Sequence, residues 1–167
     1  MGSLTNVELQ DIATSLKLPI VGVFSKDQLP KERRVGSYYI NMQDHDEGNG
    51  THWIFARIFP CGKAIYFDSF GVYMPVEIKE FLKPFQPIAY SNRQIQDMKS
   101  QNCGRYCILC DYWFSYKMKE PIREYKTVEE RRKKCPVDYE LYRFLDSWSN
   151  NTMQNDKLCI ERWNKLN

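Results

Sequence analysis

The sequence predicts an α+β fold in which helices pack on a small mixed or antiparallel sheet. Runs rich in aromatic and β-branched residues, which are typical of strands, cover residues 36–42, 51–59 and 64–68. Turn residues at 60–62 place the last two of these runs in a hairpin. A nearly continuous apolar stretch from residue 103 to about 117 is typical of a long buried helix. The order of helix, strands, hairpin, helix, strand and core helix belongs to the α+β class.

The chain ahead of the first strand is expected to form a helix over residues 6–16. Thr5 is a suitable N-cap, and Glu8 three residues later completes a capping box. The helix should end at Leu18-Pro19, because a residue that precedes proline is disfavoured in the α conformation. Residues 20–30 are mixed in character and indicate a loop with short extended pieces.

Turn and breaker residues divide the rest of the chain. A polar, acidic loop at 43–50 separates the first two strands. Pro75 can open a helix that ends at Pro84, and a short strand follows at 87–90. A polar loop at 94–102 leads into the long buried helix. Further helices are expected at 127–134, 137–148 and 158–164.

Length and composition favour one globular domain. The 167 residues suffice for a single core, which we expect over residues 4–117, with a helical C-terminal extension over 118–167. Hydrophobic residues make up 43% and charged residues 27%, and no apolar stretch approaches the ~20 residues that span a membrane. A net charge of +3 does not by itself argue for nucleic-acid binding. Six cysteines without a signal peptide indicate free thiols in a reducing compartment rather than a secreted disulfide scaffold.

Cys103 is the strongest candidate for a nucleophile. It stands where the polar loop meets the buried helix, and the partial positive charge at a helix N-terminus favours a thiolate. Gly104 follows it, so no side chain blocks an approaching substrate backbone. The neighbouring backbone N–H groups are then free to stabilise an oxyanion.

A nucleophilic cysteine needs a base and a group that orients the base. The chain has two histidines, and His52 at the start of a strand is a better base than His45 in the acidic loop. Asp68 ends the strand that pairs with the His52 strand, so both side chains can lie on the same side of the sheet. Asp46 and Glu47 are competing carboxylates in the acidic loop.

A side-chain amide suits the second oxyanion donor, because it donates a hydrogen bond without taking a proton. Four amides precede the nucleophile, namely Gln94, Gln96, Gln101 and Asn102. Their spacing alone does not choose between them.

Several short motifs occur together and in a fixed order. His52-Trp53 is followed by Phe-Asp-Ser-Phe-Gly at 67–71, and Gln96 precedes Asn-Cys-Gly-Arg-Tyr-Cys at 102–107. This order resembles the adenovirus maturation proteases (adenain), a pattern that recurs in virophages and Polinton-type elements and, more distantly, in the ubiquitin-like-protein proteases. The segment Gly-Val-Phe-Ser-Lys-Asp-Gln-Leu-Pro at 22–30 resembles the same family. The resemblance covers about residues 4–117.

The resemblance implies an adenain-like cysteine protease fold with the nucleophile at the N-terminus of a buried central helix. It implies endopeptidase activity on viral precursor proteins of the capsid or core during virion maturation. By this resemblance Cys103 is the nucleophile, His52 is the general base and then acid, and Asp68 orients the imidazole. Gln96 becomes the oxyanion donor beside the backbone N–H of Cys103. Many family members have Glu where this chain has Asp68.

The resemblance also implies a substrate preference and partners. The family prefers small residues around the cleaved bond, so a narrow cleft lined by Trp53, Gly104 and Asn102 is expected. No cofactor is required, although DNA or a viral peptide would activate the enzyme. We expect a monomer without membrane association, located in the virion and in the host-cell cytoplasm or nucleus.

Two further clusters have plainer interpretations. The basic run Arg131, Arg132, Lys133 and Lys134 could contact DNA phosphates, but it follows two glutamates and is also typical of a solvated helix face. Cys103, Cys107 and Cys110 recur along one helix, and a straight helix rarely supplies the geometry of a metal site. No metal is therefore expected.

Three other functions remain open. A protease or deconjugase of ubiquitin-like proteins would use the same residues, and so would an effector-type acyltransferase. A catalytically inactive binding protein would not need them. The compact chain favours the processing endopeptidase over the deconjugase. The residues around Trp53 and Asp68 favour a protease over an acyltransferase. The intact catalytic set argues against an inactive protein.

Overall fold

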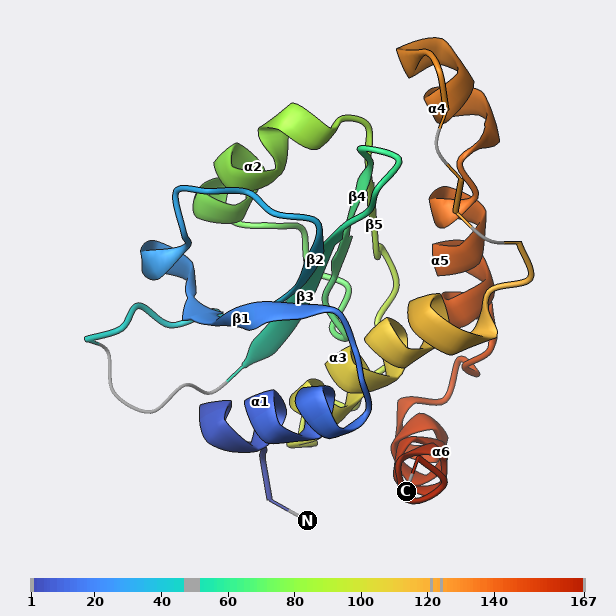
Figure 1. Ribbon diagram of the computed structural model, residues 1–167. Helices are drawn as coiled ribbons and strands as arrows, with labels where there is room; N and C mark the ends of the chain where they lie inside the picture. The colour runs from blue at the N-terminus through green and yellow to red at the C-terminus, as the bar shows by residue number, and fades with distance from the viewer. Residues whose placement is uncertain (1, 47–51, 121, 124, 167) are drawn as a thin grey trace.

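The protein is an α+β structure built on a five-stranded mixed sheet, as the sequence predicts. The computed structural model describes residues 2–46, 52–120, 122–123 and 125–166. The strands follow the chain order across the sheet: β1 (Ile20–Ser25), β2 (Gly36–Asn41), β3 (Trp53–Ile58), β4 (Ala64–Phe67) and β5 (Ile88–Tyr90). The inner pairs are antiparallel, whereas β1 and β5 run parallel to their neighbours (Figure 1).

Strand β1 lies within residues 20–30, where the sequence indicated a loop with short extended pieces. Residues Ile20–Ser25 pair in parallel with β2, and the register shifts between Ile20 and Gly22. As an edge strand β1 has one neighbour, and of its six residues only Gly22 is buried. The strand therefore lacks the alternation of apolar and polar residues that identifies a half-buried strand.

The helices cover both faces of the sheet. They are α1 (Asn6–Ser15), α2 (Val76–Leu82), α3 (Cys103–Tyr112), α4 (Val128–Lys134), α5 (Val137–Asp146) and α6 (Thr152–Asn164). Helix α3 continues as a π-helix over Trp113–Lys117. The capping box at α1 is confirmed, because Thr5 and Glu8 exchange hydrogen bonds of 3.1 Å. None of the helices in the described ranges is long and apolar enough to cross a membrane.

Helix α6 begins earlier than the expected start near residue 158. Its N-cap is Asn151, whose side-chain oxygen accepts a hydrogen bond from the Gln154 N–H at 3.1 Å. The first turn of α6 is polar apart from the exposed Met153, so the hydrophobic pattern becomes visible only one to two turns later, at Leu158 and Cys159.

Two apolar clusters hold the sheet between layers of helices. On one face Tyr38, Ile40 and Tyr66 pack against α2. On the other face Tyr39, Phe55 and Phe67 pack against α1, α3, α5 and α6 (Figure 1). Because both faces are buried, the central strands are hydrophobic on both sides. Helix α3 is buried from Cys103 to Asp111.

A buried polar network fixes the middle of α3 on the sheet. Asp111 accepts hydrogen bonds from Ser37 at 2.8 Å, from the Tyr39 hydroxyl, and from Arg57 at 2.9 Å. Arg57 also donates to the Ser115 hydroxyl at 2.8 Å. Burial raises the pKa of the Asp111 carboxyl above its usual range, although the surrounding donors act in the opposite direction. The network fixes the position of α3 along β2 and β3. It therefore also fixes the position of Cys103, the first residue of α3.

Candidate active site

His52 and Asp68 meet at one end of the sheet. His52 directly precedes β3 and Asp68 directly follows β4, and these strands are antiparallel neighbours with Phe55 opposite Phe67. The pairing places the start of one strand beside the end of the other, and His52 Nε2 lies 2.8 Å from Asp68 Oδ1. The two side chains are thus brought together on the same side of the sheet, as the sequence suggested.

Two residues for which the sequence suggested no role, Phe70 and Ser91, hold the carboxylate and the backbone of Asp68 in place. Asp68 Oδ1 also accepts a hydrogen bond from the Phe70 N–H at 2.8 Å. The Ser91 hydroxyl accepts from the Asp68 N–H at 2.8 Å and donates to the Asp68 carbonyl at 3.1 Å. The Phe70 ring stacks on His52, with ring centroids 4.6 Å apart. The carboxylate and the imidazole are therefore fixed by their surroundings as well as by each other.

Cys103 is the first residue of α3 and is 2% exposed. Its Sγ accepts a hydrogen bond from the Trp53 N–H at 3.4 Å, so the thiol lies against the start of β3, next to His52. No side chain caps α3, because the Asn102 side-chain oxygen accepts from Arg105 at 3.1 Å instead. The N–H groups of the first helical turn consequently remain available to an anion beside Cys103.

The electrostatics of His52 match a base that is paired with a thiol. Burial of the imidazole lowers its pKa. The hydrogen bond to Asp68 and the interaction with the Cys103 side chain raise the pKa by a larger amount, so that the net result is a rise from 6.5 to about 9. His52 Nδ1 is buried and has no hydrogen-bond partner in the described part of the chain. The ring nitrogen that is not bonded to Asp68 is therefore the one free to exchange a proton.

Gln96 is buried but engaged elsewhere. Its side-chain nitrogen donates to the Ser100 carbonyl at 3.0 Å and lies 3.3 Å from the Ser100 hydroxyl, while its side-chain oxygen accepts from Ser69. Gln96 thus links the segment after Asp68 to the loop that leads into Cys103. Its role as oxyanion donor stays a prediction, and the amide would have to turn away from Ser100 to fulfil it.

The other amide candidates differ in position. Gln94 is exposed and donates to the Gln96 carbonyl at 3.0 Å. Gln101 is exposed, and Asn102 is half-buried at the N-cap of α3. The position of Asn102 beside Cys103 is compatible with the predicted contact to substrate, which stays a prediction.

Trp53 and Gly104 connect the site to the N-terminal segment. The Trp53 indole donates to the Leu4 carbonyl at 2.9 Å, and Arg105 donates to the Gly2 carbonyl at 2.7 Å. A Cβ on Gly104 would lie 3.3–3.4 Å from atoms of Leu9 and Leu4, so glycine here allows α1 to approach α3. Gly104 has a packing reason for its missing side chain, and its part in substrate binding stays a prediction.

A cavity of about 570 Å³ lies beside the site on the β1 side. It is lined by Trp53, Leu4, the end of β1 and neutral polar side chains such as Gln28 and Asn41. The lining residues carry no charge. The prediction that Trp53 contacts substrate is compatible with this position.

The competing histidine is bonded to another aspartate. The exposed His45 contacts Asp27, which raises the pKa of its imidazole. Asp46 is exposed, and Glu47 lies outside the described residues.

The basic run lies on α4, where the exposed Lys133 pairs with Glu129 at 3.1 Å. The side chain of Arg132 is outside the described part. Contact of this run with DNA stays a prediction.

All six cysteines are buried free thiols, but their chemistry differs. Burial raises the pKa of Cys107, Cys110 and Cys159 well above the usual thiol value, which makes these thiols unreactive. Cys61 contacts Cys135, and this contact lowers the pKa of Cys61 to about 7. Among the described residues, no three metal-ligating side chains converge on one point.

Comparisons with known proteins do not assign this chain to a family. No protein-family model matches the sequence, and no curated protein matches it significantly. Among solved structures, the chain is similar to the crystal structure of the ASFV pS273R protease, with a TM-score of 0.41 and 17% sequence identity. The match covers 86% of this chain and 66% of that chain. So distant a similarity carries no argument about activity, and the resemblance to the adenovirus proteases stays a prediction.

Proposed function

We propose that the protein is a cysteine endopeptidase that processes viral precursor proteins of the capsid or core during virion maturation. One observation carries the proposal: His52 is hydrogen-bonded to Asp68 at 2.8 Å through one ring nitrogen, while the other ring nitrogen is buried and, in the described part of the chain, has no partner apart from the interacting Cys103 thiol. A nucleophile, a base and an orienting carboxylate in this relation are what acyl transfer by a thiol requires.

The chemistry follows from the two nitrogens of His52. The bond to Asp68 holds the hydrogen on Nε2, so Nδ1 can take the proton from Cys103. The thiolate attacks the substrate carbonyl carbon, and the tetrahedral intermediate collapses when the C–N bond breaks. Imidazolium Nδ1–H gives its proton to the leaving amine. Water then attacks the thioester carbonyl carbon while Nδ1 accepts a proton from it. The C–S bond breaks, the acid product leaves, and Cys103 leaves as a thiolate beside the imidazolium, from which it can regain its proton.

The first turn of α3 supplies the proposed oxyanion site. Its uncapped N–H groups lie beside Cys103, where the partial positive charge of a helix start stabilises a negative oxygen. The Cys103 N–H is the main donor in this proposal. Gln96 would join it after the amide turns away from Ser100.

The substrate class rests on the sequence resemblance alone. We propose small residues around the cleaved bond, activation by DNA or a viral peptide, and action in the virion and in the host-cell cytoplasm or nucleus. Binding of DNA through Arg131, Arg132, Lys133 and Lys134 belongs to the same proposal. A protease or deconjugase of ubiquitin-like proteins is the alternative that a substrate panel would separate.

The decisive experiment measures the alkylation rate of each cysteine by iodoacetamide and mass spectrometry, with and without duplex DNA. Cys103 should react fastest, and His52→Ala should abolish its advantage. His45→Ala changes the only other histidine and should leave the rates unaltered. Hydrolysis of a fluorogenic peptide with glycine on both sides of the cleaved bond should follow the Cys103 rate. The proposal fails if Cys103 reacts no faster than the other five cysteines under either condition.

A further inference from the structure

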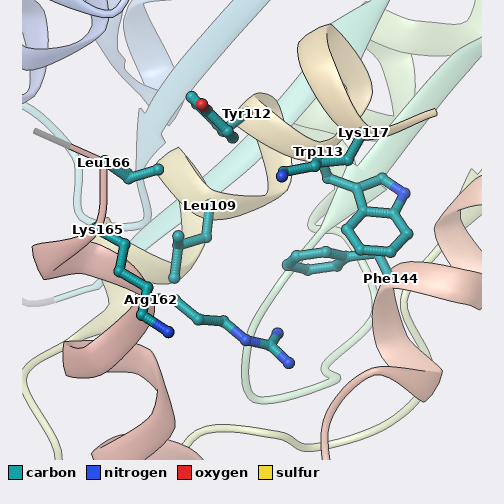
Figure 2. A pocket seen from close by; sticks show the side chains of 8 residues that line it. All are labelled: Leu109, Tyr112, Trp113, Lys117, Phe144, Arg162, Lys165 and Leu166. Carbon is teal, nitrogen blue, oxygen red and sulfur yellow. The ribbon is translucent and has the colours of Figure 1, made fainter.

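A second cavity lies at the opposite end of α3 from Cys103. Its volume is about 390 Å³, and it is enclosed by the end of α3, the π-helix, α5 and α6 (Figure 2). Its lining residues are Leu109, Tyr112, Trp113, Lys117, Phe144, Arg162, Lys165 and Leu166. None of them belongs to the candidate active site.

The inner wall of this cavity is apolar and already formed. Leu109 and Phe144 are 6% and 2% exposed. The Trp113 indole donates to Glu140 at 3.1 Å, and its ring contacts Phe144 edge-on with centroids 5.6 Å apart. Figure 2 shows Leu109 between the α6 side chains and the Trp113–Phe144 pair. Trp113 and Lys117 belong to the π-helix, a distortion that is frequent at functional sites.

The charged lining of the cavity has one sign. Lys117, Arg162 and Lys165 contribute positive charge, and no acidic side chain is among the described residues that line the cavity. Arg162 is fixed by bonds to the Ser147 carbonyl at 2.9 Å and hydroxyl at 3.0 Å. Lys117 and Lys165 are exposed at the rim, where their ammonium groups can reach a ligand.

We propose that this cavity binds a small amphipathic organic anion. Its apolar aromatic or aliphatic body lies against Leu109, Trp113 and Phe144, and its single carboxylate faces the cationic rim that Lys117 and Lys165 form. The cavity volume falls within the range of about 300–1,000 Å³ that is usual for small-ligand sites. An apolar wall with a uniformly cationic rim is complementary to such a ligand and disfavours neutral and cationic ones.

The test uses 8-anilinonaphthalene-1-sulfonate as an anionic probe and N-phenyl-1-naphthylamine as its neutral counterpart. Both are titrated by fluorescence against the folded full chain carrying Cys103→Ala, so that the result is independent of any peptidase activity. Lys117→Glu and Lys165→Glu should each weaken the anionic probe about threefold to tenfold and leave the neutral probe unchanged. Lys157→Glu makes the same charge change on the exposed side of α6 and should affect neither probe.

The carboxylate is tested by competition. Sodium dodecanoate should displace the anionic probe and raise the melting temperature of the protein, because ligand binding stabilises the folded state. Dodecanol, which has the same chain without the charge, should displace it more weakly. The proposal is overturned if the anionic probe does not bind, if it binds the three Lys variants equally, or if dodecanol competes as well as dodecanoate.

Discussion

Two buried aspartates in the described part of the chain, Asp68 and Asp111, form ion pairs of similar length that differ in how completely they are satisfied. Asp111 bonds Arg57 at 2.9 Å and also accepts from two hydroxyl groups, so the network around it is closed. Asp68 bonds His52 at 2.8 Å, but among the described residues the second, buried nitrogen of His52 has no partner apart from the interacting Cys103 thiol. An unmatched buried polar atom costs about 1–3 kcal/mol, so a structural pair has reason to avoid it. The Asp111–Arg57 pair, here called the closed pair, holds α3 in place. In the Asp68–His52 pair, here called the open pair, the second ring nitrogen can accept or donate a proton.

The largest effect should come from an isosteric change in the open pair. Asp68→Asn keeps the shape of the side chain but removes the charge that fixes the tautomer and the protonation of His52. Peptide hydrolysis per folded molecule, measured as kcat/KM, should fall about 10²- to 10⁴-fold, in addition to the stability that is lost with the ion pair to His52. A loss of activity that merely parallels a loss of folded protein would remove the distinction between the two pairs.

The same change in the closed pair should act on stability instead. Asp111→Asn leaves the mostly buried Arg57 charge without a counterion, which should cost about 3–5 kcal/mol of unfolding free energy. Urea denaturation of the two Asn variants side by side gives the comparison. Activity per folded molecule of Asp111→Asn should stay within a few-fold of the wild type, and a larger deficit would mean that the network also adjusts the site.

The pH dependence of stability should reveal the proton on His52. The folded pKa of about 9 exceeds the unfolded value of 6.5, so the stabilisation is complete below pH 6.5 and is lost as the pH rises to about 9. The change should be about 3 kcal/mol. Cys61, whose pKa is lowered to about 7, acts in the opposite direction over this range. The measurement is therefore the difference between wild type and His52→Gln at each pH, and a flat difference would contradict the raised pKa.

A smaller effect is expected from the residue that fixes the Asp68 backbone. Ser91→Ala removes the hydroxyl that bonds both the N–H and the carbonyl of Asp68, at a cost of about 1 kcal/mol in stability. The carboxylate should then be less well placed, so kcat should fall by up to about tenfold while KM is maintained. Ser15→Ala, on the exposed side of α1, serves as the control. An effect on KM alone would place Ser91 in substrate binding.

The smallest effect on stability should come from an ion pair that is exposed to solvent on the surface of α4. Lys133 and Glu129 lie 3.1 Å apart on α4, and both side chains are more than 70% exposed. Lys133→Ala should change the unfolding free energy by less than about 0.5 kcal/mol. Thermal denaturation in low and high salt would test this, and a change above 1 kcal/mol would show that α4 contacts something more than solvent.

Local signals in the sequence located much of the fold and of the candidate site. Thr5 and Glu8 mark the start of α1 through hydrogen bonds between near neighbours, and the loop-to-apolar transition at Cys103 marks the start of α3. The hairpin turn implied that His52 and Asp68 would meet, because a short connection leaves antiparallel strands few registers.

What the sequence did not indicate depends on contacts between distant segments. Ser91 reaches Asp68 only because β5 pairs in parallel with β4, and Phe70 reaches His52 because the chain turns after β4. The orientation of the Gln96 amide depends on Ser69 and Ser100, so spacing from Cys103 could not reveal it. Strand β1 was missed because an edge strand with one neighbour carries little hydrophobic alternation.

The bonds from Trp53 to the Leu4 carbonyl and from Arg105 to the Gly2 carbonyl have a practical consequence. Each fastens the first residues to an element that carries a candidate catalytic group, β3 behind His52 and α3 behind Cys103. Preparations that differ only in how their amino terminus is trimmed or tagged would then differ in turnover. Under the proposed function, a preparation with mixed amino termini would contain molecules that differ in turnover rate as well as in mass.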